Sequence, residues 1–160
     1  MKINRQNIPL GKETTISEDV DFSYQKFDPL FCRGIPKCHI EGKALQYEDA
    51  LRLKIRLTGE IIGVCAYTLE DVPLSFDVKD ELIFVNEEDG ENYYEPHQII
   101  DLDKYLLAII YSSMPVKVIK KGAQPPKGGD GYRLLSEDEL NEERKNKHNS
   151  VFDALDDIDL

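Results

Sequence analysis

The feature that most constrains the fold is a strict alternation of apolar and basic residues that begins at position 51. The apolar side chains fall on odd positions and the basic ones on even positions: Leu51, Leu53, Ile55 and Leu57 against Arg52, Lys54 and Arg56. Successive side chains of a strand point to opposite faces, so this period predicts a strand with one buried face and one basic stripe. The alternation continues to Cys65, which predicts a long or bent strand, with Gly59 or Gly63 allowing a bulge or corner.

The segments on either side predict further short strands. Residues 38–45 form a candidate partner strand, with residues 46–49 as the connection. Alternation over residues 72–78 predicts the next strand, residues 82–85 a further short one, and residues 116–119 a final edge strand. Connections this short fit an antiparallel meander better than parallel strands joined by helical crossovers.

One apolar helix follows an acidic loop over residues 86–98. Asp101 is placed to cap this helix, and Pro115 follows its end. Its apolar residues fall on one helical face: Leu102, Tyr105, Leu106, Ile109 and Ile110. We therefore predict an α+β fold, in which an antiparallel, strongly bent β-sheet is packed by one main α-helix.

The chain has 160 residues, which is one domain's worth of sequence, and its charge changes sign near the C-terminus. Residues 120–131 are rich in glycine, proline and lysine, which predicts a mobile basic loop, and residues 117–133 hold five basic side chains and one acidic one. Residues 136–139 read Ser-Glu-Asp-Glu, the capping-box pattern of a helix start, and few apolar residues follow. We expect a single α+β domain over residues 1–135 and a flexible acidic tail, partly helical or disordered, over residues 136–160.

The net charge indicates the kind of partner. The chain carries a formal charge of −11, from 31 acidic and 20 basic side chains, which repels a phosphate backbone over most of its surface and attracts a basic partner. No apolar stretch approaches the roughly 20 residues that a membrane-spanning helix needs. The N-terminal residues lack the apolar core and cleavage site of a signal peptide. We expect a cytoplasmic protein with no membrane partner.

The cysteine and histidine residues do not have the spacing of a metal or catalytic centre. An odd number of cysteines in a cytoplasmic chain favours reduced thiols: Cys32, Cys38 and Cys65. Cys38 and His39 are adjacent in a predicted strand, so they point to opposite faces. The glycines of residues 128–131 lack the lysine and hydroxyl of a phosphate-binding loop. We expect no catalytic residue, no metal and no cofactor; a hydrolase or nuclease with an unrecognised site stays an alternative.

Two basic features are candidate contacts to RNA phosphates. The first is the predicted strand face: Arg52, Lys54 and Arg56. The second is the loop region: Lys117, Lys120, Lys121, Lys127 and Arg133. A solvated strand face and a polar linker would give the same pattern. The acidic C-terminus presents apolar side chains at helical spacing, which predicts a segment that docks onto a partner: Val151, Phe152, Leu155 and Ile158.

Three segments together resemble the bacterial YceD family. Residues 63–76 read Gly-Val-Cys-Ala-Tyr-Thr-Leu-Glu-Asp-Val-Pro-Leu-Ser-Phe and resemble the family segment in which a cysteine and a leucine precede a strand. Residues 100–102, Ile-Asp-Leu, open a helix that ends at Met114 and Pro115, and residues 151–155, Val-Phe-Asp-Ala-Leu, resemble the family's closing motif. The resemblance covers roughly residues 35–158.

The chain departs from the family pattern at two places. Tyr67 stands where many YceD relatives have an arginine. Ile119, Lys120 and Lys121 stand where many have further cysteines. Any metal or thiol role of those relatives therefore does not transfer to this chain.

The YceD resemblance implies a role in the accumulation of large-subunit (23S) ribosomal RNA and implies no catalytic mechanism. We therefore expect a non-enzymatic factor in ribosome assembly. Two mechanisms stay open. In the first, the acidic surface and tail bind a basic ribosomal protein or an assembly factor of the large subunit. In the second, the basic strand face and loop contact rRNA directly.

Overall fold

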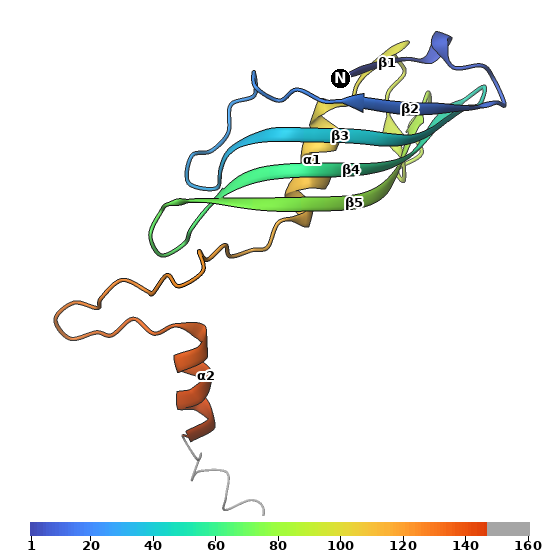
Figure 1. Cartoon of the computed structure of the whole chain (residues 1–160). Coiled ribbons are helices and arrows are strands. Elements are labelled where there is room, and N and C mark those ends of the chain that lie inside the picture. The colour runs from blue at the N-terminus through green and yellow to red at the C-terminus, as the bar shows by residue number, and fades with distance from the viewer. Residues whose placement is uncertain (147–160) are drawn as a thin grey trace, which may run out of the picture.

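The computed structural model describes residues 1–146 and consists mostly of strands (Figure 1). In chain order the elements are β1 (Lys2–Asn4), the 3-10 helix η1 (Arg5–Asn7), β2 (Glu13–Asp19), β3 (Cys32–Gln46), β4 (Ala50–Val64), β5 (Asp71–Val85), β6 (Tyr93–Tyr94), β7 (Ile99–Asp101), α1 (Asp103–Ser113) and α2 (Glu137–Asn146). This content confirms the α+β class. No helix among these residues has the length and apolar character that crossing a bilayer requires.

The main sheet is mixed rather than wholly antiparallel. Its five strands lie in the order β2-β3-β4-β5-β6, and β1 pairs with β7 in a separate two-stranded sheet. Strands β2 to β5 pair antiparallel, but β6 pairs parallel with β5 through Phe84 and Tyr93. The prediction of an antiparallel sheet is therefore wrong at this edge. Residues 86–92 bring the chain back before β6 begins, so β6 runs in the same direction as β5.

The predicted strong bend finds no support in the strand pairing. β4 and β5 pair residue for residue from Ala50↔Val85 to Val64↔Asp71 without a register shift. β5 is one 15-residue strand, whereas the sequence predicted two shorter ones. The charged residues at positions 79–81 do not interrupt the strand, because the apolar side chains on both sides of them keep the same parity.

The irregularity expected near Gly59 lies in its partner strand. The register of β3 against β4 shifts between Cys32 and Gly34 and again between Gly34 and Lys37. A Cβ atom at Gly59 would lie 2.1 Å from the carbonyl oxygen of Lys37, so glycine permits the close approach of the two backbones there.

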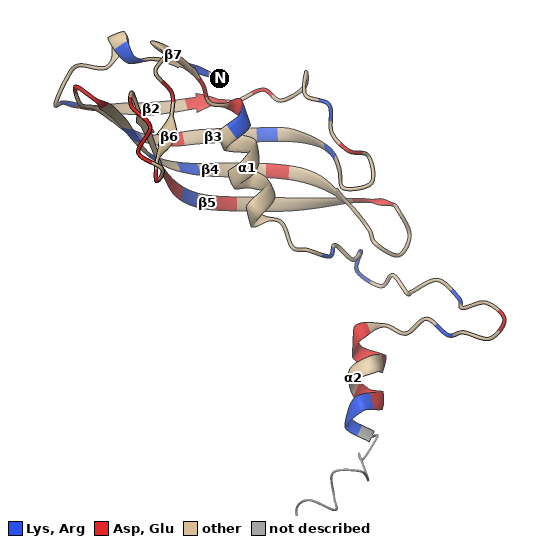
Figure 2. Cartoon of the chain, turned by 180° about the vertical axis from the view of Figure 1, so that it is seen from behind, with Lys and Arg blue, Asp and Glu red and all other residues tan. Residues whose placement is uncertain are grey.

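Helix α1 packs against one face of the main sheet and leaves the opposite face uncovered (Figures 1 and 2). Leu51, Leu53 and Leu57 of β4 are fully buried in the shared core, which confirms the alternation. Leu106 and Ile110 of α1 are fully buried against them.

The start of α1 differs from the expected cap by one residue, because Leu102 is the N-cap residue and its side chain makes no capping bond. The carboxylate of Asp101 accepts a hydrogen bond from the Asp103 N–H at 3.1 Å, which satisfies one free donor of the first turn. A second bond to Asp103 comes from the N-terminal ammonium group of Met1. The start of the chain is therefore tied to the start of the helix.

The segment after α1 forms no strand, so the predicted edge strand over residues 116–119 is wrong. Val118 is buried, and its carbonyl oxygen accepts a hydrogen bond from the Ala66 N–H at 2.8 Å. Pro115 has no N–H to donate. This segment therefore joins the body through the single backbone hydrogen bond of Val118 and does not form the regular hydrogen bonds of a strand pair.

Beyond residue 120 the chain runs away from the sheet to α2 (Figures 1 and 2). The predicted capping box is confirmed. The Ser136 N–H donates to the Glu139 carboxylate at 2.7 Å, and the Glu139 N–H donates to Ser136 Oγ at 3.2 Å.

Candidate functional site

The basic stripe lies on the uncovered face of the sheet, as the alternation predicts. Arg52 and Arg56 are partly exposed and Lys54 is exposed, while the odd residues between them face the core. We define the open face as the side chains of β2 to β5 that lie on the same side of the sheet as Lys54.

Cross-strand carboxylates neutralise both arginines of the stripe. Arg56 donates to Asp77 through Nε at 2.7 Å and Nη2 at 2.6 Å, and to Glu41 through Nη1 at 3.2 Å. These bonds raise the pKa of Arg56, and the Arg56 guanidinium in turn lowers the pKa of Asp77. Arg52 Nε lies 3.2 Å from Glu81 Oε1. The arginines are therefore engaged within the protein instead of being available to phosphates.

The charges of the whole open face balance. The strand register places six basic side chains on it, Lys37, Lys43, Arg52, Lys54, Arg56 and Lys79, and seven acidic ones, Glu13, Asp19, Glu41, Glu60, Asp71, Asp77 and Glu81. The Asp71 carboxylate lies 3.3 Å from Arg33 Nε at the irregular end of β3, and this pair makes the totals equal. Among residues 1–146, Lys37, Lys54 and Lys79 of this face form no ion pair. The open face therefore has little of the positive field that a phosphate footprint needs.

The second predicted basic feature starts at the opposite end of the sheet. Lys117 Nζ lies 3.2 Å from the Tyr67 hydroxyl and 3.6 Å from Glu137, and Lys120 Nζ lies 3.2 Å from Glu70. Arg133 pairs with Glu143. Lys121 and Lys127 are exposed and have no ion-pair partner in the part of the chain that the structure describes.

The stripe and the loop do not form one surface. Ala66, where the loop region contacts the body, follows Arg56 by ten residues of mostly extended chain, which corresponds to roughly 30 Å. The docking segment of Val151, Phe152, Leu155 and Ile158 lies outside the described residues.

Acidic side chains gather in the loop between β5 and β6, where Figure 2 shows a red segment near β6. Glu87, Glu88 and Glu91 are exposed there. Asp89 accepts hydrogen bonds from the Asn92 N–H at 2.8 Å and the Glu91 N–H at 3.0 Å, and its bonds with Asn92 and Glu91 lower the pKa of Asp89. The loop therefore presents its carboxylates from an ordered turn.

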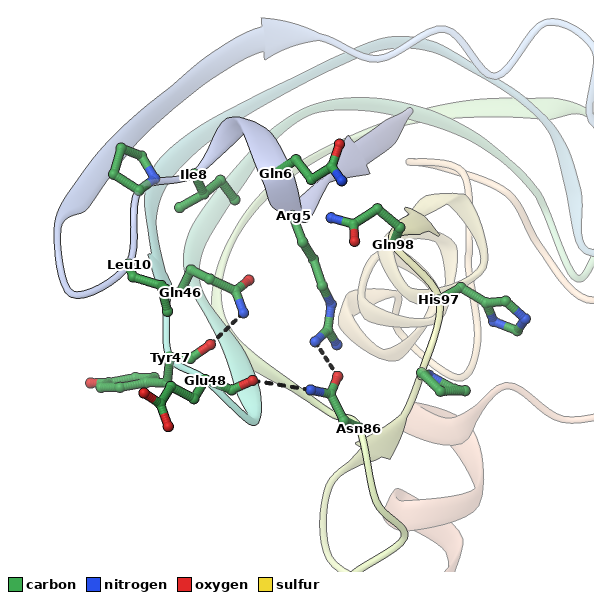
Figure 3. A pocket seen from close by; sticks show the side chains of 12 residues that line it. Arg5, Gln6, Ile8, Leu10, Gln46, Tyr47, Glu48, Asn86, His97 and Gln98 are labelled. Atoms are coloured by element: carbon green, nitrogen blue, oxygen red, sulfur yellow. Dashed lines mark hydrogen bonds between the residues drawn. The ribbon is translucent and has the colours of Figure 1, made fainter.

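A polar pocket lies where η1, the β3–β4 turn and residues 96–98 meet (Figure 3). Its volume is about 590 Å³, and Arg5 and Gln46 line it as buried side chains. The sequence interpretation missed both. Arg5 belongs to a segment without a helix or strand period, so its burial could not be predicted. Gln46 could have been found, because it follows Ile40 and Ala44 on the even positions of β3 that face the core.

Three side chains on the paired strands β2 and β3 lie in the order of a hydrolase triad. Ser17 Oγ lies 3.4 Å from His39 Nε2, and His39 Nδ1 lies 2.7 Å from Asp19 Oδ1. The Asp19 side chain is 91% exposed, so water solvates the carboxylate and weakens its effect on the imidazole. The arrangement therefore gives the hydrolase alternative little support.

The cysteines are buried and free. Cys38 faces the core while His39 faces solvent, which confirms their opposite orientation. Burial raises the pKa of the Cys38 thiol to about 11. The Lys120 N–H donates to Cys65 Sγ at 3.3 Å and lowers the pKa of that thiol to about 7. Within residues 1–146 no group of three His, Cys, Asp or Glu side chains is arranged to hold a metal ion.

The fold and its charged surfaces define an α+β protein with an uncovered sheet face, an acidic loop and a pocket lined by buried polar side chains. No family model matches the chain, and no solved structure matches it. The chain is similar to the uncharacterized protein YlbN of Bacillus subtilis (strain 168). The two are 22% identical over 147 residues, which cover 86% of this chain and 78% of that protein.

Proposed function

We propose that this protein is a non-enzymatic factor that supports 23S rRNA accumulation and large-subunit assembly by binding a basic ribosomal protein or assembly factor. The observation that carries the choice of a protein partner is the pairing of Arg52 and Arg56 with Glu81, Asp77 and Glu41. A stripe whose cations already have carboxylate partners is a poor phosphate-binding surface.

The charge distribution favours a basic partner. The open face is balanced, whereas the chain as a whole carries −11. The excess negative charge therefore lies elsewhere, and the acidic loop and the first turn of α2 supply part of it: Glu87, Glu88, Asp89, Glu91, Glu137, Asp138 and Glu139. Such a field attracts basic proteins and repels RNA.

The link to the ribosome comes from the resemblance of residues 63–76 and 100–115 to the YceD family. These two segments are neighbours in the fold. The turn over residues 65–70 receives the chain that leaves α1, through the bond between Ala66 and Val118. The similarity to YlbN carries no functional information of its own, because that protein is uncharacterized.

Affinity capture from cells, with and without RNase, tests the proposal. We expect large-subunit ribosomal proteins or assembly factors to be captured after RNase treatment. Added salt and a neutralised acidic loop should each weaken capture, the latter by about tenfold, or 1.4 kcal/mol. The loop variant carries Glu87→Gln, Glu88→Gln and Glu91→Gln.

A matched control separates the acidic loop from net charge. A second variant makes the same charge change on the strands, with Glu13→Gln, Glu18→Gln and Glu60→Gln, and should capture the partner like the unchanged protein. Capture that disappears with RNase would contradict a protein partner. Equal losses in the two variants would contradict the role of the loop.

Direct rRNA binding is the second candidate, and the two exposed lysines of the loop favour it. Lys121 and Lys127 have no ion-pair partner among residues 1–146. The double charge reversal Lys121→Glu and Lys127→Glu should abolish binding to 23S rRNA if this mechanism operates, and it should leave capture of a ribosomal protein intact if the first one does.

A further inference from the structure

Two buried polar atoms of the same pocket have no partner. Among the side-chain nitrogen and oxygen atoms that lie buried within residues 1–146, Arg5 Nε and Gln46 Oε1 make no hydrogen bond. The two residues are 8% and 7% exposed, and both line the polar pocket of Figure 3. Buried polar groups in folded proteins almost always have partners, so two orphans in one pocket indicate a ligand that supplies them.

The surrounding bonds fix which atom of each side chain is left over. The terminal nitrogens of Arg5 donate to Asn86 Oδ1, to the Glu95 carbonyl at 2.9 Å and to the Phe84 carbonyl at 3.4 Å. Gln46 Nε2 donates to the Tyr47 carbonyl at 2.5 Å. Exchanging the oxygen and nitrogen of the Gln46 amide would set oxygen against oxygen, so Oε1 is the free acceptor.

The walls of the pocket are built by the chain itself. The Arg5 N–H donates to the Gln98 carbonyl at 3.0 Å, and the Gly11 N–H donates to the Gln46 carbonyl at 2.9 Å. The side-chain amide of Asn86 donates to the Glu48 carbonyl at 3.2 Å. A pocket of about 590 Å³ that is formed in advance loses little entropy when it binds a ligand.

The chemistry of the orphan atoms selects the ligand. Arg5 Nε–H needs an acceptor, and Gln46 Oε1 needs a donor. The Gln46 oxygen and the nearby Glu48 carboxylate would repel an anion, and the Arg5 guanidinium would repel a cation. A neutral amide carries a carbonyl acceptor and an N–H donor on one planar group, so it offers both of the groups that the two atoms lack.

The lining favours a peptide over a nucleic acid. Arg5 is the one basic Lys or Arg side chain among the lining residues, and its terminal nitrogens already donate within the protein, so it has no paired donors left for a phosphate. Pro9, Leu10, Tyr47 and Pro96 complete the walls, and the Leu10 and Tyr47 side chains are 66% and 42% exposed. Such apolar walls suit the side chains that flank a peptide group.

We propose that this pocket binds a peptide group of a protein partner, whose carbonyl accepts from Arg5 Nε–H while its N–H donates to Gln46 Oε1. The inference deepens the proposed function and rests on it, because it gives the protein partner a docking point at the end of the sheet.

The probe is acetylglycine N-methylamide, which has two peptide groups and no charge, and it is titrated into the full chain. We expect the NMR signal of Arg5 Nε–H to shift with a Kd of about 1–10 mM, the range of a fragment this small. Its ester analogue, in which each N–H is replaced by oxygen, should bind at least tenfold more weakly, because it cannot donate to Gln46 Oε1.

Matched variants separate the pocket from unspecific binding. Gln46→Met removes the acceptor and should weaken the probe at least tenfold, while Gln124→Met makes the same change on an exposed residue of the C-terminal loop and should bind like the unchanged chain. If Gln46→Met does not fold, which amide signals far from the pocket will reveal, the comparison of amide and ester on the unchanged chain decides.

Three results would overturn the proposal: no shift at about 100 mM probe, equal binding of amide and ester, or stronger binding of uridine than of the probe. The titration needs no ribosomal component, so it fails separately from the proposed function. If the probe binds but capture of a ribosomal partner fails, the pocket proposal holds and the proposed function fails. If capture succeeds but the probe does not bind, only the pocket proposal fails.

Discussion

Removing the carboxylates that pair with the basic stripe should turn the open face into an RNA-binding surface. The variant carries Glu41→Gln, Asp77→Asn and Glu81→Gln, which release Arg52 and Arg56 from their partners. The open face then changes from balanced to +3. Exposed ion pairs contribute little to stability, so the fold and the melting temperature should be nearly unchanged.

The salt dependence of binding gives the size of the effect. Each cation that contacts a single-stranded phosphate adds about 0.7 to the slope of log K against log salt. Lys37, Lys54 and Lys79 give a slope of about −2.1, and the two released arginines raise its magnitude to about 3.5. Between 200 and 50 mM salt, affinity should therefore rise about 18-fold for the unchanged chain and about 130-fold for the variant.

Fluorescence anisotropy with a labelled single-stranded RNA measures both slopes. The control is the acidic-loop variant with Glu87→Gln, Glu88→Gln and Glu91→Gln, which makes the same change in net charge and leaves the stripe paired. An unchanged chain that already shows a slope near −3.5 would refute the reasoning. So would a control that gains as much RNA affinity as the open-face variant, because net charge and not pairing would then govern binding.

Three further predictions test the fold and its thiols. A Cβ at Gly42 would lie 2.1 Å from the Lys54 carbonyl oxygen, so Gly42→Ala should lower the free energy of unfolding by about 1–3 kcal/mol in urea denaturation. The control Gly34→Ala adds a Cβ in open space and should leave the free energy of unfolding unchanged. Ser136→Ala removes the cap of α2 and should destabilise that helix by about 1 kcal/mol, seen as faster amide exchange over residues 137–145; unchanged exchange would contradict the capping role. Cys65 should titrate near pH 7 and Cys38 near pH 11 when followed by ¹³Cβ shifts, and a Cys65 titration at or above pH 9 would contradict the bond from Lys120. Between pH 7 and 9 the unfolded chain holds the Cys65 proton that the folded chain has lost, so this thiol should make stability rise with pH, an effect that Cys65→Ser removes; between pH 9 and 11 Cys38 should make stability fall.

Much of the local structure could be read from the sequence. The period of two from Leu51 placed β4, its buried face and its basic face, because side-chain direction along a strand depends only on parity. The capping box at Ser136 placed the start of α2, because its hydrogen bonds join residues three positions apart. The edge pairing of β6 could not be read in this way, since a two-residue strand has no period.

The sequence alone determined that Arg52, Lys54 and Arg56 share an exposed face, but only the tertiary structure decided whether that face is basic. The partners of Arg56, Glu41 and Asp77, lie on two other strands, and the register that sets them opposite one another comes from burial along whole strands. The pocket has the same origin. Arg5 reaches Asn86, 81 positions away, because η1 packs where β3 and β5 end and β4 begins. No local sequence pattern predicts a contact between segments so far apart.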